Sequence, residues 1–529
     1  MDPDLTSIQQ ARELVEQAHA AQHTYSKFTQ DKVDHIVAAM AGAGAGAASE
    51  LARLAHEETG FGRIDSKTEK NLFATKTLHE RMRGMNTAGI INRPEGGSIW
   101  EVATPMGVVA ALIPSTNPTS TAMYKAIISA KARCGIVMSP HPRAVRCTRR
   151  ALAVVADAAY DAGAPPGLFG CLQDVSLAGT NELLEHDHTD VILATGGTAM
   201  VRAAYSKGKP AYGVGSGNVP VFVDRSADVT KAAADLVYGA SFDWGTLCST
   251  ERSIVADLPI RTRLLDALRS EGAYVVDDRE KQKLRDVLFV NGRLNVEQVG
   301  RSPSHIAGLA GFSVPPSTRA LVAEVEEVGK NEPLSSETLS PILSFYTADG
   351  WEAGCDRCIE VLGFGGMGHT LGLHCKNDRI IEAFALEKPA MRIVVNTVAA
   401  LGSVGFTTAL FPAMTLGPGT TGGSITSDNI SPLHLLNYKR LAFETDPVNP
   451  PAEQRRGTSS GRKTARSSAH GSWIDEIESR LRERAGNPPV QPTATRRSPA
   501  GNLQTARPDT SAGEIDEKRV QDLIKRFKK

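Results

Sequence analysis

The fold is decided by the stretch Gly107-Val-Val-Ala-Ala-Leu-Ile-Pro-Ser-Thr-Asn-Pro-Thr-Ser120. It opens with a short, uncharged apolar run, which predicts a buried strand over 107–113. Residues 120–133 have a helical pattern, and a second apolar run, Gly135-Ile-Val-Met138, predicts the next strand. A strand, a helix and a strand in this order predict a βαβ unit.

The same alternation continues toward the C-terminus. A helix is predicted over residues 144–162, and apolar strands are predicted over Val191–Ala194 and Val219–Val223. Buried strands separated by helices are typical of a parallel sheet that helices cover on both faces. The sequence therefore predicts an α/β domain built on a parallel sheet.

A second α/β block follows a helix predicted over residues 228–243. The block runs from Arg252 to about Ile425, and its strand candidates are Ser253–Ala256, Ile342–Tyr346 and Arg392–Asn396. Two α/β blocks, each with a glycine-rich region, predict a two-domain enzyme with a cleft between the domains.

The composition argues against several classes of protein. Of 529 residues, 41% are hydrophobic and 22% are charged, and 59 basic residues balance 59 acidic ones. Such a mixture is typical of globular proteins, and zero net charge argues against a basic coat for nucleic acid. The acidic N-terminus lacks the basic and apolar parts of a secretory signal. No uncharged apolar run reaches the ~18 residues of a membrane span.

Scattered cysteines and an unusual glycine run both have structural interpretations. Seven cysteines without a framework spacing favour a reducing compartment. Cys355 and Cys358 form a CxxC on a predicted helix, but no second ligand pair follows, so we interpret them as structural and expect no metal. Within the helical residues 1–90, the alternating run Gly42–Ala47 follows no strand. We therefore interpret it as a helix segment rather than a phosphate loop.

The last 84 residues differ in composition from the rest. Residues 446–529 carry 17 basic and 11 acidic residues, so the balanced charge hides a basic tail on an acidic body. Polar linkers flank two predicted amphipathic helices, near 472–485 and 514–528, each with a single apolar stripe. Helices this short are unstable alone in water. They must either fold back on the rest of the chain or bind in a groove of another protein. We favour binding to another protein.

Two glycine-rich stretches and one cysteine could carry chemistry. Gly363-Phe-Gly-Gly-Met-Gly368 matches GxGxxG but precedes a predicted strand, whereas a dinucleotide fingerprint needs a helix after it. Ala194-Thr-Gly-Gly-Thr-Ala-Met200 lies between a strand and a helix, the better context for a phosphate. Cys248 lies at a glycine-containing junction between a helix and a strand. It is either a nucleophile exposed to the cleft or a buried structural thiol.

Taken together, seven ordered motifs resemble the CoA-acylating aldehyde dehydrogenases. This family includes the aldehyde-oxidising half of bifunctional alcohol/aldehyde dehydrogenases and enzymes packaged in bacterial microcompartments. The resemblance covers about residues 5–445. The motifs are Gly107–Ser120, Ser139–Arg143, Ala194–Gly197, Gly208–Asn218, Gly245–Cys248, Glu337–Pro341 and Gly366–His369.

The resemblance implies an aldehyde dehydrogenase-like α/β fold. It implies a Rossmann-type NAD-binding domain over residues 1–224, with an oligomerisation strand near 96–104, and a catalytic thiol domain over 225–424. Residues 425–445 would be a return segment that takes part in oligomerisation, and the flexible tail of 446–529 would follow. We expect a homo-oligomer, either a dimer or a tetramer.

The resemblance also implies a role for each site residue. Cys248 would be the nucleophile, and Asn117 would donate to the oxyanion together with the backbone N–H of Cys248. His369 is a candidate for deprotonating the CoA thiol or steering CoA, although a lone histidine is more often structural. The residues implied to line the NAD site, with Glu337 at the nicotinamide ribose, are Leu112, Ile113, Pro114, Ser115, Thr116, Asn117, Gly197, Gly215, Glu337 and Leu416.

One departure from the hydrolytic aldehyde dehydrogenases decides between two products. Those enzymes activate water with a glutamate in a Glu-Leu-Gly-Gly type motif, whereas the corresponding stretch here, Gly213-Val-Gly-Ser-Gly217, has no carboxylate. Without that general base, water attacks a thioester slowly. Coenzyme A is then the expected acceptor, and acyl-CoA the expected product.

The expected substrate is a short-chain aldehyde similar to propionaldehyde. The expected oxidant is NAD, and the sequence leaves the preference between NAD and NADP open. Acylating sulfoacetaldehyde oxidation is an alternative, and so is a non-catalytic scaffold that bridges shell proteins. The tail resembles the encapsulation peptide of microcompartment cargo. We therefore expect a cytoplasmic enzyme inside a bacterial microcompartment, bound to shell proteins through its tail, with no nucleic-acid or membrane partner.

Overall fold

The computed structural model describes residues 2–95 and 97–449. The chain divides into one unit of Met1–Thr445 and another of Asp446–Lys529. The two predicted tail helices, near 472–485 and 514–528, lie outside the described residues. No helix in the described part of the chain combines the length and the apolar composition that a membrane crossing requires.

The first sheet contains five parallel strands in the order β5-β4-β3-β6-β7. The central strand β3 (Val108–Ile113) is buried along its whole length, as the opening sequence stretch predicts. The other strands are β4 (Gly135–Pro140), β5 (Phe169–Cys171), β6 (Val191–Thr195) and β7 (Ala211–Val214). The strand order reverses between β3 and β6, and ligands bind at such a switch point in α/β sheets.

Side chains of β3 alternate between two apolar cores, because successive residues of a strand point to opposite faces. Val109, Ala111 and Ile113 pack in the core with α2 (Gln30–Gly46), α6 (Pro118–Lys131) and α7 (Val145–Asp161). Val108, Ala110 and Leu112 pack in the core with α1 (Pro3–Tyr25), α8 (Leu177–Glu185) and α9 (Thr198–Tyr205). Helices therefore cover both faces of the sheet, as expected.

The second sheet contains seven parallel strands in the order β10-β13-β14-β9-β8-β15-β16. These are β8 (Val219–Val223), β9 (Glu251–Asp257), β10 (Ala273–Val275), β13 (Ala320–Glu324), β14 (Ile342–Ala348), β15 (Leu371–His374) and β16 (Ile393–Val395). The sequence division at residue 224 assigned β8 to the first domain, but β8 pairs with β9 and β15. An apolar strand fits either sheet, and its hydrogen-bond partners decide which one it joins.

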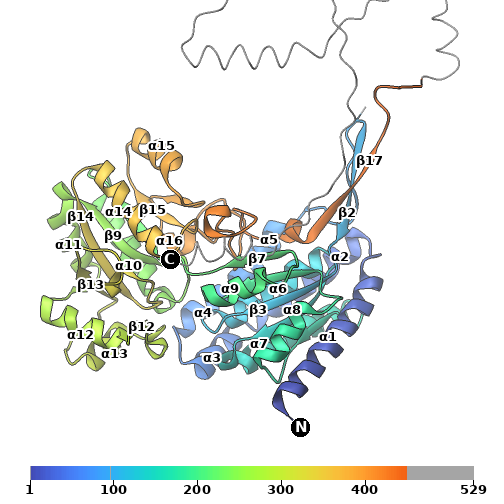
Figure 1. The fold of residues 1–529 in the computed structure, drawn as a ribbon, viewed down its shortest axis with the longest axis horizontal. Helices are drawn as coiled ribbons and strands as arrows, with labels where there is room; N and C mark the ends of the chain where they lie inside the picture. The colour runs from blue at the N-terminus through green and yellow to red at the C-terminus, as the bar shows by residue number, and fades with distance from the viewer. Residues whose placement is uncertain (1, 96, 450–529) are drawn as a thin grey trace, which may run out of the picture. The chain divides into compact units, whose positions relative to one another are not determined.

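Helices also cover both faces of the seven-stranded sheet. One core contains side chains of α10 (Val229–Ser241) and α11 (Arg261–Ser270). The other contains side chains of α12 (Asp278–Leu288), α13 (Pro303–Leu309), α14 (Trp351–Phe364) and α15 (Asp378–Glu387). Figure 1 shows the two covered sheets as separate lobes of the same unit. Cys355 and Cys358 are buried in α14, which supports the structural interpretation of both thiols.

The N-terminal residues are helical, as predicted. α3 (Ala48–Thr59) follows α2, and α4 (Ile64–Leu72) continues through a π-helical turn, Phe73–Thr77, into α5 (Leu78–Met82). The glycine–alanine run lies in α2 and its C-terminal end, where Gly44 packs against Thr75, Met123 and Val155. The helix interpretation of this run is therefore confirmed.

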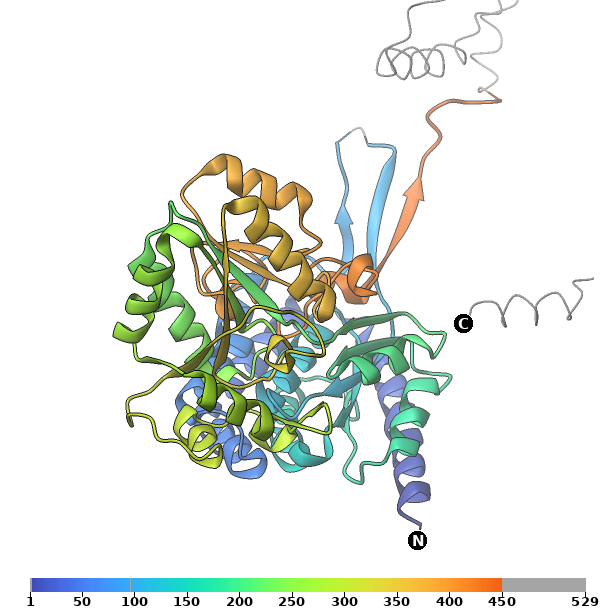
Figure 2. The same cartoon turned by 60° about the vertical axis from the view of Figure 1, so that its left-hand side comes forward.

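A three-stranded antiparallel sheet joins distant parts of the chain. Strand β2 (Ile99–Pro105) pairs with β1 (Gly89–Asn92) on one side and with β17 (Leu436–Ala442) on the other. Figures 1 and 2 both show β2 and β17 side by side, extending from the helices and larger sheets. β2 overlaps the segment near 96–104, and β17, which pairs with it, lies within residues 425–445.

Three short elements complete the unit. β11 (Phe289–Val290) and β12 (Arg293–Leu294) form a small hairpin, and α16 (Ala399–Gly402) follows β16. The glycine-rich 363–368 segment ends α14 and leads to strand β15, so the order that excluded a dinucleotide fingerprint is confirmed.

Candidate active site

The loops after β3 and β6 meet at the switch point of the first sheet and open into a cavity of about 240 Å³. Residues from both lobes line this central cavity. They are Pro114, Ser115, Thr116, Asn117, His141, Thr195, Gly196, Gly197, Val214, Gly215, Ser216, Thr246, Leu247, Cys248, Ser249, Glu337, Leu339, Val404, Met414 and Leu416. The structure therefore brings Cys248 and Asn117 together with most of the predicted cofactor residues.

Leu112 and Ile113 are the exceptions among those predicted residues. They are 4% and 3% exposed in β3, and neither lines the central cavity. They are the last residues of the strand, and their side chains pack in the two apolar cores of the sheet.

The nucleophile candidate lies on a tightly folded segment. Between α10 and β9 the backbone turns through Asp243, Trp244 and Gly245, whose φ angles of 49°, 51° and 74° are left-handed. Cys248 follows three residues later, with its side chain partly exposed. A Cβ atom on Gly217 would lie 1.8 Å from the carbonyl oxygen of Cys248, so only glycine permits this approach.

His369 contacts the thiol directly. Its Nε2 lies 3.3 Å from Sγ of Cys248, and its Nδ1 lies 2.9 Å from Oγ1 of Thr370. The buried guanidinium of Arg392 donates to the carbonyl oxygen of His369 at 3.1 Å and so fixes its backbone. Burial lowers the pKa of His369 to about 3, helped by Arg392, so the resting imidazole is neutral.

Burial raises the pKa of Cys248 to about 12, with a further increase from Glu337 and an opposing effect from Arg392. The resting pair is therefore a thiol beside a neutral imidazole, and not a thiolate–imidazolium pair. The thiol must lose its proton as it attacks.

This protonation state predicts a pH profile for alkylation. Below the pKa, the thiolate fraction rises about tenfold per pH unit. We expect the rate of inactivation by iodoacetamide to rise by about that factor per unit from pH 7 to pH 9, without a plateau. Initial rates at constant ionic strength measure this. A rate that is flat above pH 6 would mean that a thiolate–imidazolium pair exists instead.

Asn117 caps the start of α6, but its side chain makes no capping bond. Its Oδ1 accepts from Nζ of Lys70, and its Nδ2 donates to the carbonyl oxygen of Thr246 at 3.1 Å and to Oγ1 of Thr116 at 3.0 Å. One amide N–H therefore faces the Cys248 loop through Thr246, and the other faces Thr116 in its own loop. An oxyanion donor needs this orientation.

Glu337 lies at the boundary of two cavities. Its Oε1 accepts the backbone N–H of Gly217 at 2.9 Å. Burial raises the pKa of this carboxyl, against the hydrogen bond from Gly217. A second cavity, of about 690 Å³, shares Gly215, Ser216 and Glu337 with the central one and contains His369. His369 thus reaches Cys248 from the neighbouring cavity.

The discounted GxGxxG stretch borders this second cavity. Gly366 has a φ of 89°, and a Cβ atom there would lie 1.9 Å from the carbonyl oxygen of Gly217. The glycines therefore let the turn pack against the segment that supports Cys248.

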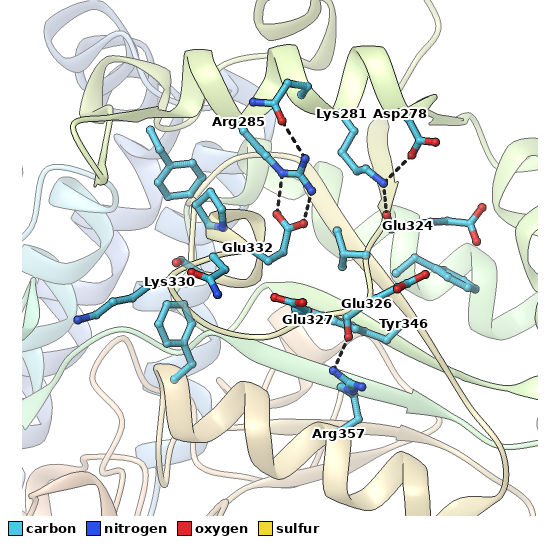
Figure 3. A pocket seen from close by; sticks show the side chains of 18 of the residues that line it. Asp278, Lys281, Arg285, Glu324, Glu326, Glu327, Lys330, Glu332, Tyr346 and Arg357 are labelled. Carbon is cyan, nitrogen blue, oxygen red and sulfur yellow. Dashed lines mark hydrogen bonds and ion pairs between the residues drawn. The ribbon is translucent and has the colours of Figure 1, made fainter.

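A larger cavity, of about 1230 Å³, lies in the second lobe. Figure 3 shows its charged side chains turned toward one another. Arg285 donates to Glu332 at 3.0 Å, Lys281 pairs with Asp278 at 2.8 Å, and Arg357 donates to the carbonyl oxygen of Glu326 at 2.7 Å. None of the predicted site residues lines it. Among the described residues, no cluster of His, Cys, Asp and Glu is arranged to hold a metal ion.

The sequence analysis missed three groups that shape the site, namely Lys70, Arg392 and His141. Lys70 belongs to a helix rich in charged residues, a composition that usually marks a solvated face. Arg392 was predicted only as the first residue of a strand, with no role in the site. His141 appeared only inside a family motif, although it lines the central cavity.

Comparison with known proteins places this geometry in a family. The model of the aldehyde dehydrogenase family matches residues 4–282. The bifunctional aldehyde-alcohol dehydrogenase AdhE of Escherichia coli K12 is 38% identical over 443 residues, which cover 83% of this chain and 50% of that protein. The chain thus spans about half the length of such curated relatives.

Solved structures agree with the sequence relatives. An acetylating aldehyde dehydrogenase from Geobacillus thermoglucosidasius is 47% identical, with a TM-score of 0.83, over 85% of this chain and all of that one. A propionaldehyde dehydrogenase from the Clostridium phytofermentans fucose utilisation bacterial microcompartment is 26% identical (TM-score 0.75; coverage 83% and 98%). The Rhodopseudomonas palustris propionaldehyde dehydrogenase, solved with CoA and an acylated cysteine, is 28% identical (TM-score 0.74; coverage 82% and 97%). The chain belongs to the aldehyde dehydrogenase family.

Proposed function

We propose that this protein oxidises a short, uncharged aldehyde with NAD and transfers the acyl group to coenzyme A. The observation that carries this proposal is the 3.3 Å contact between Cys248 and His369, with Asn117 lining the same cavity as Cys248. A thiol, a neutral base and an amide donor are the three groups that thioester formation from an aldehyde requires.

The chain's own residues account for the first step. Sγ of Cys248 attacks the aldehyde carbon, and Nε2 of His369 takes the thiol proton as the C–S bond forms. The amide N–H of Asn117 and the backbone N–H of Cys248 stabilise the alkoxide of the thiohemiacetal. Bound NAD would supply the hydride acceptor for that carbon, which would leave a thioester on Cys248.

The fate of the thioester depends on which nucleophile can be activated. Glu337 is the one carboxylate among the described residues that line the central cavity, and it already accepts the N–H of Gly217. Water therefore lacks a positioned base. The CoA thiol can approach through the second cavity, where His369 is placed to take its proton. The acetylating and CoA-bound relatives support this assignment.

The residues at the switch point fit NAD. Cβ atoms on Gly196 and Gly197 would contact nothing within 4 Å. Space is therefore open beside the backbone at the start of α9. A phosphate can approach such a helix start closely. Glu337 lines the same cavity, and a ribose hydroxyl would donate its O–H to the carboxylate.

The lining of the central cavity supports an uncharged substrate. Its apolar wall contains Leu247, Val404, Met414 and Leu416, and no lysine or arginine is among the described lining residues. An adjoining pocket, lined by Lys70 and by apolar residues that include Leu247, has a volume of only about 10 Å³. The small space and the uncharged wall of the central cavity support a chain of two or three carbons over a sulfonate such as sulfoacetaldehyde. The grouping of Cys248, Asn117 and His369 argues against a catalytically dead scaffold.

A panel of aldehydes tests the proposal. Purified protein with propionaldehyde or acetaldehyde, NAD and CoA should form NADH and acyl-CoA in equal amounts, measured by absorbance and mass spectrometry. Sulfoacetaldehyde and long-chain aldehydes should react more slowly. If the product were the free acid and CoA had no effect on rate, the acylating proposal would be wrong. NADP in a parallel series establishes the cofactor preference.

We further propose that the enzyme is cargo of a bacterial microcompartment in the cytoplasm, held by shell proteins through residues 446–529. The support is the amphipathic pattern of the tail and the microcompartment origin of a relative. We also propose a homo-oligomer. The antiparallel sheet exposes apolar side chains, with Ile90 at 52%, Ile99 at 47% and Leu441 at 40%, and a partner subunit would cover them.

Deletion of residues 446–529 tests the cargo role. Because all of the proposed site residues lie before residue 446, we expect kcat and KM to change less than about twofold, as for a change remote from a site. Co-purification with shell proteins from the native host should be lost. Full recovery of the truncated enzyme with intact shells would contradict the role, and a tail with Leu523 and Phe527 changed to Ser provides a control of unchanged length.

A further inference from the structure

A cluster of buried charges lies behind Asn117. Lys67 and Lys70 are three residues apart on α4, so they share one face of the helix. They are 2% and 4% exposed, and Asp243, which they both contact, is 0% exposed. Burying charges is costly unless each is paired and hydrogen-bonded. Three ionisable groups in this position therefore need an explanation.

Asp243 is satisfied by four donors. The backbone N–H of Arg63 lies at 2.6 Å, Nζ of Lys67 at 3.1 Å and Oγ1 of Thr246 at 2.5 Å, and Nζ of Lys70 completes the set. A Cβ atom on Gly62 would fall 2.0 Å from the carboxylate, so glycine makes room for it. Burial alone would raise the pKa of Asp243, but the two lysines hold it below its ordinary value.

Two lysines against one carboxylate leave one positive charge in the interior. Burial lowers the pKa of Lys70 to about 7, against the attraction of Asp243, and Lys67 lowers it further. The ammonium of Lys70 has only donors. It therefore faces the acceptor atom of Asn117, the amide oxygen.

This contact determines which way the amide points. With Oδ1 held by Lys70, Nδ2 must face the opposite side, where it donates to the carbonyl oxygen of Thr246. Thr246 lies two residues before Cys248 and lines the same cavity. Lys67 also donates to the carbonyl oxygen of Thr116 at 3.1 Å, which fixes the loop before Asn117.

We propose that Lys70, held by Asp243, is a positioning residue that turns the Asn117 amide N–H toward the Cys248 loop. In its protonated form Lys70 also polarises the amide, which makes the N–H a stronger donor to a developing alkoxide. The inference rests on the proposed aldehyde oxidation, because Asn117 serves as an oxyanion donor only in that chemistry.

Lys70→Met tests the proposal, since it removes the donor and the charge but keeps a long apolar stem. Asp243 retains Lys67, Thr246 and the N–H of Arg63. We expect kcat/KM for the aldehyde to fall about 10²-fold, near the loss from removing one oxyanion donor. The Kd for NAD, measured by calorimetry, should stay within twofold. Lys76→Met, an exposed lysine on the same helical run, is the matched control and should leave kcat/KM unchanged.

A double-mutant cycle separates positioning from general damage. If Lys70 acts through Asn117, Lys70→Met should cost less than about threefold in a chain that already carries Asn117→Ala. Losses that multiply in the double variant would overturn the proposal, and so would a Lys70→Met enzyme of unchanged kcat/KM. If Lys70→Met does not fold, the same cycle is run with Lys70→Gln, which keeps an N–H donor and should retain more activity.

The wild-type assay keeps the two proposals distinguishable. An unmodified chain that oxidises none of the aldehydes refutes the proposed function. A wild type that is active and sensitive to Asn117→Ala, but additive in the cycle, refutes only the role of Lys70.

Discussion

Replacement of Cys248 with alanine should lower kcat for CoA-dependent aldehyde oxidation by a factor on the order of 10⁶, the loss seen when a catalytic nucleophile is removed. No other thiol can substitute, because Cys248 is the one cysteine among the described lining residues of the central cavity. The measurement is NADH formation with propionaldehyde at saturating NAD and CoA. Mass spectrometry without CoA should find the acyl adduct on wild type and none on the variant.

Cys171→Ala is the matched control for this substitution. Cys171 is also partly exposed, but it lies in β5, away from the cavity. The Cys171→Ala enzyme should keep its full kcat, and its melting temperature should match that of Cys248→Ala within a few degrees. Substantial turnover by Cys248→Ala would remove this residue from the role of nucleophile.

Omission of CoA should have the second largest effect. The thioester then waits for water, which lacks a positioned base, so steady-state NADH formation should fall ~10²–10⁴-fold. A burst of one NADH per subunit should precede the slow phase, because oxidation comes before acyl transfer. Stopped-flow absorbance measures the burst, and intact-mass analysis should show the acyl group on Cys248.

Addition of CoA to the stalled enzyme provides the control. The acyl adduct should disappear and acyl-CoA should form without new NADH. Rapid turnover without CoA, with free acid as the product, would mean that a base for water exists in the cavity.

Much of the fold follows from local sequence. Val108–Ile113 forms a buried strand because an uncharged apolar run has no solvated face, and this strand sits at the centre of its sheet. Strand β8 shows where local reasoning stops. Val219–Val223 has the same apolar composition as strands of the first sheet, and only hydrogen bonds to β9 and β15 assign it to the second.

The site was predicted in part, for a comparable reason. Cys248, Asn117 and Glu337 stand in motifs of the resemblance, and the cavity contains all three. Lys70 had no such signal, because charged residues on a helix usually face water. Its burial depends on Asp243, which lies 173 residues away in the chain. A local sequence pattern contains no information about an ion-pair partner so far away in the chain.

His369 illustrates the opposite case. A lone histidine is more often structural, and its motif suggested only a role with CoA. The 3.3 Å contact with Cys248 depends on the approach of β15 to the thiol loop, which no local pattern encodes. The resemblance identified His369 as a candidate, and the tertiary structure identifies Cys248 as the group it contacts.

The residues that contact one another in the site are far apart in the sequence, and this affects how the protein refolds. Asn117 reaches Thr246 across 129 residues, and Cys248 reaches His369 across 121. Contacts this distant in sequence form late, because closing long loops costs entropy before the contacts compensate for it. After dilution from denaturant, helical circular dichroism should therefore recover before catalysis does. Regain of activity reports that both lobes and α4 have assembled, which makes it a stricter measure of the native state than secondary structure.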